Sequence, residues 1–202
     1  IRLSLVGSEM CIRDRLYDVL IIGAGPSGSN AAISYKNLNP DLKVGLIDKS
    51  IFPRDKSCGD AIGPGVISAL KRFNNQHILD NEPQVVSTTL YGPENIGIQN
   101  YIPEVKNKED SIVYVIPRID LDNRILNLAK DLDVDVFEGY SFVSFEKDLD
   151  NKLVVEIKNG DNITKLGAKI LVGADGANSR VRKQLNVNTN SDWHKAIAIR
   201  AY

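Results

Sequence analysis

A glycine-rich turn between an apolar run and a following helix constrains the fold of this chain more than any other feature. Residues 17–22 predict a strand buried on both faces of a parallel sheet, because the run 19–22 is short, continuous and aliphatic. It leads directly into Gly23, Gly25 and Gly28 in the pattern G-x-G-x-x-G, and residues 27–37 then predict a helix. A strand, this turn and a helix in that order indicate a site for the pyrophosphate of a dinucleotide.

Each glycine has a physical role in that interpretation. Gly23 permits the tight turn out of the strand, Gly25 lets the backbone approach the pyrophosphate, and Gly28 lets the helix pack closely on the strand. Pro26 suits the first helical position because an N–H there would have no acceptor within the helix. The unpaired N–H groups and the dipole at the helix start favour phosphate groups.

A second predicted strand, 43–48, ends in an acidic residue, Asp48. A carboxylate at this distance from the glycine turn is placed to accept hydrogen bonds from ribose hydroxyls. The alternative is a glycine-rich turn in some other α/β domain. The predicted dinucleotide contacts are Gly23, Ala24, Gly25, Pro26, Ser27, Gly28, Asp48 and Lys49.

Composition excludes several other kinds of protein. The chain has 202 residues and a net charge of −1, and its basic residues are interspersed with acidic ones, so we expect no nucleic-acid partner. No apolar run approaches the roughly 18–20 residues of a membrane span. Two cysteines make no disulfide framework, and the two histidines lack metal-ligand spacing, so we predict a cytoplasmic protein without a metal site.

A polar loop at 52–64 contains the cysteine Cys58 within the run Ser57, Cys58, Gly59, Asp60. Its Gly and Pro residues and its length allow it to reach over a bound ligand. On chemistry alone the cysteine is either a small buried hydrophobic residue or a reactive thiol.

The glycine turn, Asp48 and the loop Pro-Arg-Asp-Lys-Ser-Cys-Gly-Asp together resemble the geranylgeranyl reductase family. That family is a branch of the flavoproteins built like p-hydroxybenzoate hydroxylase. The resemblance implies FAD, rather than NAD, at the glycine turn. It also implies that Ser57, Cys58, Gly59 and Asp60 lie near the flavin ring.

Two further segments are similar to the same family. Arg118 begins a predicted amphipathic helix, 117–132, where the resemblance implies a contact with FAD; the alternative is a solvent-exposed arginine at a helix end. The segments 142–145, 153–157 and 163–166 predict a three-stranded meander, and the resemblance implies that Val143 contacts the adenine through its backbone.

A buried strand at 168–173 runs into Ala-Asp-Gly-Ala-Asn-Ser-Arg-Val-Arg, which is similar to a motif of the flavoprotein superfamily. Gly176 permits a turn with a positive φ angle, and Asn178 or Ser179 can cap a helix starting near residue 180. In the family this element lies close to the pyrophosphate and is associated with NAD(P)H use. Asp175 is therefore a candidate cofactor residue, with a structural turn aspartate as the alternative.

The predicted fold class is α/β: a Rossmann-like FAD-binding domain with a parallel sheet and a three-stranded β-meander, plus part of an antiparallel β substrate domain. We expect the FAD-binding domain at 16–60 and 111–187, and substrate-domain elements at 61–110 and 188–202. Residues 1–15 resemble translated adapter sequence and are expected to pack weakly; the alternative is a genuine extension. The chain is expected to be a fragment, with most of the substrate cavity beyond residue 202.

The resemblance implies an FAD-dependent reductase of carbon–carbon double bonds in an isoprenoid chain, with hydride from NAD(P)H or another donor. The expected substrates are geranylgeranyl lipids, chlorophyll precursors or menaquinone, which would bring the protein into peripheral contact with a membrane. The sequence assigns no general acid or base, because the chemistry belongs to the cofactor. The alternatives are an aromatic monooxygenase or halogenase, or a non-catalytic flavin-binding fragment.

Overall fold

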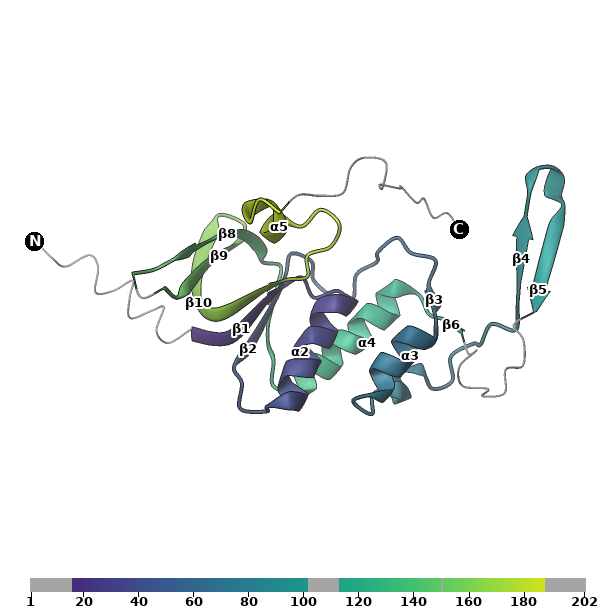
Figure 1. Cartoon of the computed structure of the whole chain (residues 1–202), viewed down its shortest axis with the longest axis horizontal. Coiled ribbons are helices and arrows are strands. Elements are labelled where there is room, and N and C mark those ends of the chain that lie inside the picture. Colours follow the sequence, from purple (N-terminus) through teal and green to yellow (C-terminus); the bar gives the residue numbers. More distant parts are fainter. Residues whose placement is uncertain (1–15, 102–112, 150, 188–202) are drawn as a thin grey trace, which may run out of the picture. The chain divides into compact units, whose positions relative to one another are not determined.

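Six strands form one sheet in the computed structural model of the chain, which describes residues 16–101, 113–149 and 151–187 (Figure 1). The chain divides into two compact units. Of the described residues, 16–54 and 122–187 belong to the first unit, and 55–121 belong to the second. The described residues do not include the predicted extension at 1–15, the segment 188–202 or residues 102–112, where the sequence predicts a turn around 106–110.

The six-stranded sheet belongs to the first unit and combines a parallel half with an antiparallel half. The strands lie in the order β7, β2, β1, β10, β9, β8; the first four are parallel to their neighbours, and β9 and β8 are antiparallel. Their bounds are β1 Leu16–Ile22, β2 Val44–Asp48, β7 Asp135–Glu138, β8 Ser141–Lys147, β9 Leu153–Asn159 and β10 Asn162–Gly173. The predicted α/β class, with a parallel sheet and an antiparallel extension, is confirmed.

Strand β10 differs from the prediction, which placed two separate strands at 163–166 and 168–173. One continuous strand pairs antiparallel with β9 through Ala168 and parallel with β1 from Gly167 onward. A single glycine between Leu166 and Ala168 provides no turn, and both flanking side chains are fully buried, so the chain stays extended through the core. The meander therefore shares its last strand with the parallel half of the sheet.

The helices of the first unit are held by their apolar faces. Helix α2 (Pro26–Leu38) follows the glycine turn and packs against β2 and β1 (Figure 1), burying Ala32 and Ile33 completely. Helix α4 (Arg118–Asp131) begins in the second unit and continues in the first, where Ile125, Leu126 and Ala129 are fully buried. Helix α5 (Arg180–Gln184) is a short turn after β10.

The second unit contains short elements, with bounds β3 Ala61–Ile62, α3 Pro64–Lys71, the 3₁₀ turns η1 Gln76–Leu79 and η2 Pro93–Asn95, β4 Ser87–Tyr91, β5 Gly97–Tyr101 and β6 Tyr114–Val115. The apolar positions within 66–73 predict a helix, and α3 begins two residues earlier because Pro64 occupies its first position. The β-rich composition of 111–116 predicts a strand, and Tyr114 and Val115 in this segment pair with β3. Residues 55–60 and 113–121 belong to the second compact unit, and the predicted extent of the FAD-binding domain, 16–60 and 111–187, stays a prediction.

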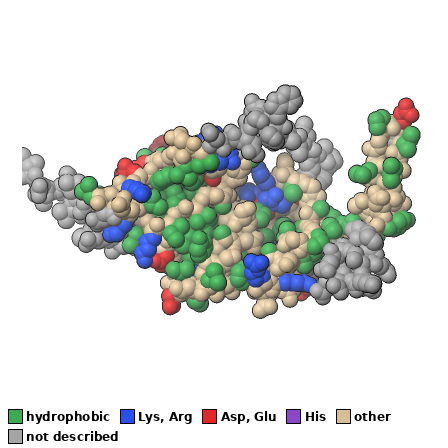
Figure 2. Space-filling view, viewed as in Figure 1, with side chains coloured by type: hydrophobic (Ala, Val, Ile, Leu, Met, Phe, Trp, Pro, Cys, Tyr) green, Lys and Arg blue, Asp and Glu red, His purple; other side chains and the backbone are tan. Residues whose placement is uncertain are grey.

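Strands β4 and β5 form a hairpin whose side chains are largely exposed. Leu90, Tyr91, Ile98 and Tyr101 are each about two-thirds exposed, and Figure 2 shows hydrophobic side chains along this hairpin. Among the helices of the described residues, none has both the length and the apolar character that crossing a membrane requires.

Candidate functional site

The turn at the carboxyl end of β1 is fixed by backbone hydrogen bonds to both neighbouring strands. The Gly23 N–H donates to the Ile47 carbonyl at 2.7 Å, and the Ala174 N–H donates to the Ile22 carbonyl at 2.7 Å. Gly23 has a φ of +103°, and a Cβ on it would lie 2.4 Å from the Ala174 carbonyl oxygen. No other residue fits here, so this glycine is required by the fold.

Gly28 and Gly25 differ in what surrounds them. A Cβ on Gly28, in the first turn of α2, would lie 1.7 Å from the Gly23 carbonyl oxygen, so the close packing predicted for this residue is observed. A Cβ on Gly25 would meet only the Arg54 Nη2 atom, at 3.5 Å. Gly25 precedes α2 without a side-chain cap, Pro26 and Ser27 form the first turn, and Ala24 is fully buried. The space beside Gly25 is thus open to a ligand, as its predicted role requires.

Asp48 joins the end of β2 to the glycine turn. Its Oδ2 atom accepts a hydrogen bond from the Ala24 N–H at 2.8 Å, and its Oδ1 atom accepts from the Ser50 N–H at 2.8 Å. Each carboxylate oxygen keeps a second lone pair for a further donor such as a ribose hydroxyl. Lys49, the neighbouring predicted residue, is exposed.

Arg54 lies at the glycine turn although the sequence analysis did not single it out. Its Nη1 atom donates to Asp122 Oδ2 at 2.9 Å, and its guanidinium carbon lies 4.8 Å from the centre of the Phe52 ring. Since Nη2 is the atom nearest to the Cβ position of Gly25, the guanidinium stands beside the start of α2. The signal available in the sequence was an arginine in the loop that follows Asp48, but its position depends on a residue 68 places away.

Three predicted residues meet within the second unit. The backbone N–H of Asp60 and the guanidinium of Arg118 both hydrogen-bond the Cys58 sulfur, and together with the charge of Arg118 they hold the pKa of this thiol below its usual value. Asp60 is buried with a φ of +57°, and its carbonyl accepts from the Ile116 N–H at 3.0 Å. Arg118 is half-buried, so it is not a solvent-exposed arginine at a helix end. Ser57 and Gly59 are exposed next to this cluster.

Val143 occupies an irregularity in strand β8. The pairing of β8 with β9 shifts register between Phe142 and Ser144, so Val143 is the extra residue of a bulge, and its side chain is 39% exposed. A bulged residue is left out of the ladder, which leaves its backbone available for another partner. The Tyr140 N–H donates to the Asp48 carbonyl at 3.0 Å, so the segment leading into β8 is joined to the end of β2.

Asp175 accepts hydrogen bonds at the start of the short helix α5. Its carboxylate accepts hydrogen bonds from the Ser179 hydroxyl and from the Arg180 N–H at 2.5 and 2.6 Å, and the Ser179 oxygen accepts from the Arg182 N–H at 3.0 Å. Ser179 is the capping residue, one of the two that the sequence allowed, and Gly176 has the expected positive φ, +81°. These contacts favour the interpretation of Asp175 as a structural turn aspartate over its interpretation as a cofactor residue.

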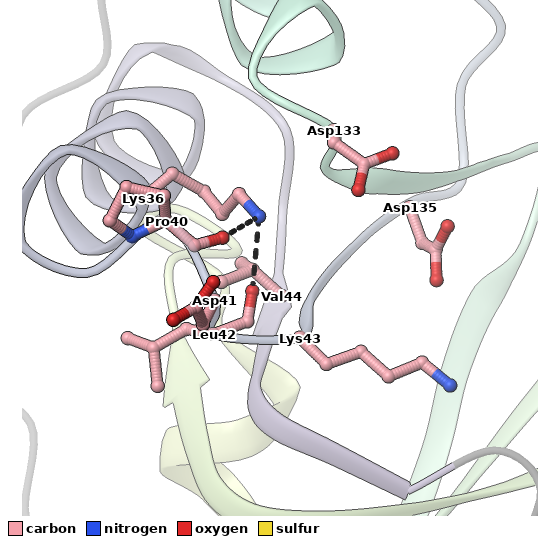
Figure 3. Close-up of a pocket in the computed structure, with 8 residues that line it drawn as sticks. All are labelled: Lys36, Pro40, Asp41, Leu42, Lys43, Val44, Asp133 and Asp135. Carbon is pink, nitrogen blue, oxygen red and sulfur yellow. Dashed lines mark hydrogen bonds between the residues drawn. The ribbon is translucent and has the colours of Figure 1, made fainter.

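A shallow pocket of about 420 Å³ lies at the opposite end of β2, next to the end of α2 (Figure 3). Within it, the Lys36 ammonium donates to the carbonyls of Pro40 and Leu42 at 2.6 and 3.2 Å. It is lined by Lys36, Pro40, Asp41, Leu42, Lys43, Val44, Asp133 and Asp135. Ligands of parallel α/β sheets bind at the carboxyl ends of the strands, so the glycine turn, and not this pocket, is the candidate site.

Comparison with known proteins shows what the chain is similar to. The model of the family described as "FAD binding domain" matches residues 16–198. The chain is 30% identical to a menaquinone reductase of Mycolicibacterium smegmatis over 92% of its own length and 44% of the relative's. It is 29% identical to a geranylgeranyl diphosphate reductase of Rhodobacter capsulatus, over 84% of the chain and 40% of the relative. The chain thus spans less than half the length of these curated relatives.

Solved structures agree with the fold. A geranylgeranyl bacteriochlorophyll reductase-like protein of Thermoplasma acidophilum superposes with a TM-score of 0.65 and 25% identity, over 80% of this chain and 40% of that one. Flavin-dependent halogenases and a p-nitrophenol monooxygenase superpose with TM-scores of 0.70 to 0.73 at 17–22% identity. At those lower identities the likeness is one of fold alone.

Proposed function

The chain belongs to the FAD binding domain family, and from that premise we propose that its glycine turn holds FAD in an FAD-dependent reductase of isoprenoid carbon–carbon double bonds. The observation that carries the proposal is the arrangement at the carboxyl ends of β1 and β2. There an open glycine (Gly25), a hydrogen-bonded carboxylate (Asp48) and a guanidinium (Arg54) lie around the start of one helix.

The donors and acceptors of this arrangement fit the ADP half of FAD. The N–H groups of the first turn of α2 and the Arg54 guanidinium suit the two phosphates. Asp48 suits ribose hydroxyls through its remaining lone pairs, and the bulged backbone at Val143 suits the adenine. The backbone at Asp175 packs closely against the glycine turn, since a Cβ on Gly23 would lie 2.9 Å from the Asp175 Cα.

The flavin half is assigned to the second unit. The Cys58 thiol, Asp60 and Arg118 form one hydrogen-bonded group there, and we assign to it the flavin ring together with the exposed Ser57 and Gly59. Guanidinium and backbone N–H donors suit the carbonyl oxygens of the ring. When bound, FAD supplies hydride transfer, and we propose NAD(P)H as the reductant that replenishes it.

The substrate class is proposed from the names of the relatives. One reduces menaquinone and another acts on geranylgeranyl diphosphate, as their names state. Both names refer to molecules with an isoprenoid chain, so the proposed substrates are a geranylgeranyl lipid, a chlorophyll precursor or menaquinone. Such substrates reside in membranes, which supports peripheral contact of the protein with a membrane surface.

A second candidate function is the aromatic monooxygenase that the sequence left open. A p-nitrophenol monooxygenase shares the fold of this chain, and a monooxygenase takes the oxygen atom that it inserts from O₂. An aromatic monooxygenase would therefore need O₂ to complete its cycle, whereas an isoprenoid reductase would not.

Anaerobic turnover of the protein encoded by the complete reading frame separates the two. The reduced protein, prepared with NAD(P)H, is mixed without O₂ with menaquinone or a geranylgeranyl lipid, and the absorbance of oxidised flavin is followed. The reductase predicts return of this absorbance and a product that carries two additional hydrogens in its isoprenoid chain. Reoxidation that occurs only after O₂ is added, with an oxygenated product, would support the monooxygenase instead.

A further inference from the structure

A buried carboxylate stands next to the proposed FAD site without belonging to the predicted set of contacts. Asp122, in α4, has a side chain with no exposed surface. An ionised group in such a place is costly unless it is paired. One partner of Asp122 is Arg54, at 2.9 Å.

Arg54 is held from two sides, and its free edge points to the glycine turn. One side is the hydrogen bond from Nη1 to Asp122, and the other is the ring of Phe52, 4.8 Å from the guanidinium carbon. Nη2 is the atom nearest to the Cβ position of Gly25, at 3.5 Å. One guanidinium thus spans from the buried carboxylate to the start of α2.

We propose that Asp122 is a positioning residue that fixes the Arg54 guanidinium for the pyrophosphate of FAD. This inference rests on the proposed function and adds to it a residue that does not itself touch the cofactor. Asp122 bonds one nitrogen of the planar guanidinium and so orients the other toward the phosphates, which a flexible arginine would do only part of the time.

Two effects of Asp122 oppose each other, and the structure indicates which is larger. Its negative charge weakens the attraction of the site for phosphate, while its hydrogen bond restricts a long side chain to one orientation. Arg54 is itself only 19% exposed and its guanidinium lies against the Phe52 ring, so the bond to Asp122 is one of the two contacts that hold it beside Gly25. Removing the anchor therefore costs more affinity than removing the charge gains.

The test is a double-mutant cycle on FAD binding with the variants Asp122→Asn, Arg54→Ala and both together. Asparagine keeps the shape of aspartate and removes its charge. Dissociation constants come from the quenching of FAD fluorescence, and the unfolding of each FAD-free variant in urea is measured separately. Asp18→Asn is the matched control, because Asp18 also forms an ion pair, with Lys169 at 2.6 Å, but at the other end of β1.

The proposal predicts that Asp122→Asn weakens FAD binding on the order of tenfold. In the Arg54→Ala background it should have no further effect beyond about twofold, and Asp18→Asn should leave binding unchanged. If Asp122 had a purely structural role, Asp122→Asn would lower FAD affinity equally in both backgrounds, and that result would overturn the inference. Tighter FAD binding by Asp122→Asn would overturn it as well. Failure of the unsubstituted chain to bind FAD would instead contradict the proposed function, and the inference with it.

Discussion

Replacing Gly28 by alanine should disrupt the turn after β1, whereas the same change at Gly25 should not. A Cβ on Gly28 would lie 1.7 Å from the Gly23 carbonyl oxygen and 2.9 Å from its carbonyl carbon. Non-bonded carbon–oxygen contacts are roughly 3.3 Å or longer, so these atoms must separate by about 1.5 Å. Both are backbone atoms, and no side-chain rotation can relieve the contact.

The magnitude follows from what must move. Shifting the Gly23 carbonyl strains the peptide unit that carries the Ala24 N–H, which donates to Asp48 Oδ2 at 2.8 Å, and losing such a hydrogen bond costs about 1–3 kcal/mol. Overpacking itself costs about 1–3 kcal/mol, and the better helix propensity of alanine offsets about 1 kcal/mol of this loss of stability. We therefore expect Gly28→Ala to lower the free energy of unfolding by about 1–5 kcal/mol, of which the upper part is a large share of a typical total.

Gly25→Ala is the matched comparison. Its φ of −67° is ordinary for alanine, and its Cβ would meet only Arg54 at a normal contact distance, so the free energy of unfolding should change by about 1 kcal/mol or less. The new methyl group occupies the space proposed for the pyrophosphate, and FAD affinity should fall by about tenfold or more. Urea unfolding followed by circular dichroism, together with FAD titration, measures both. Equal losses of stability in the two variants would refute this division of roles.

Three further predictions concern individual side chains. Asp48→Ala should weaken FAD binding by about 1–3 kcal/mol and also destabilise the turn, because Asp48 bonds the Ala24 N–H; unchanged affinity in an FAD titration would count against the site. In a Cys11→Ser background, iodoacetamide should alkylate Cys58 with a pH midpoint below that of a free thiol, since the thiolate is favoured. Arg118→Met should raise that midpoint, because it removes one of the groups that lower the pKa of the thiol. An unchanged midpoint would mean that Arg118 does not lower the pKa of Cys58. Ser179→Ala should lower the free energy of unfolding by about 1 kcal/mol through loss of the α5 cap, and a neutral result in urea would contradict that contact.

Local features were predictable because neighbouring residues determine them. The strand, turn and helix from Leu16 to Leu38 appear within one residue of the expected bounds, since aliphatic periodicity and glycines act over a few positions. The Ser179 cap and the positive φ of Gly176 were predictable for the same reason. The predicted flavoprotein family is confirmed by the family match over residues 16–198.

Features that depend on distant pairing were not predictable. In the loop after Asp48 the sequence singles out Cys58, but the guanidinium of Arg54 is placed by Asp122, which is 68 residues away. The contact between Cys58 and Arg118 arises because β3 pairs with β6, two strands too short to give a periodic signal. Strand β10 continues through Gly167 because buried partners on both sides keep it extended, which its own sequence does not show.

The most direct test of the account is the identity of the bound cofactor. The protein encoded by the complete reading frame is purified, or reconstituted with flavin, and the ligand is released by denaturation and identified by mass and chromatography. The account predicts a yellow protein with one FAD per chain, and loss of that FAD in Gly25→Ala while the fold is retained. A colourless protein that FAD does not reconstitute, or one that retains NAD instead, would contradict it.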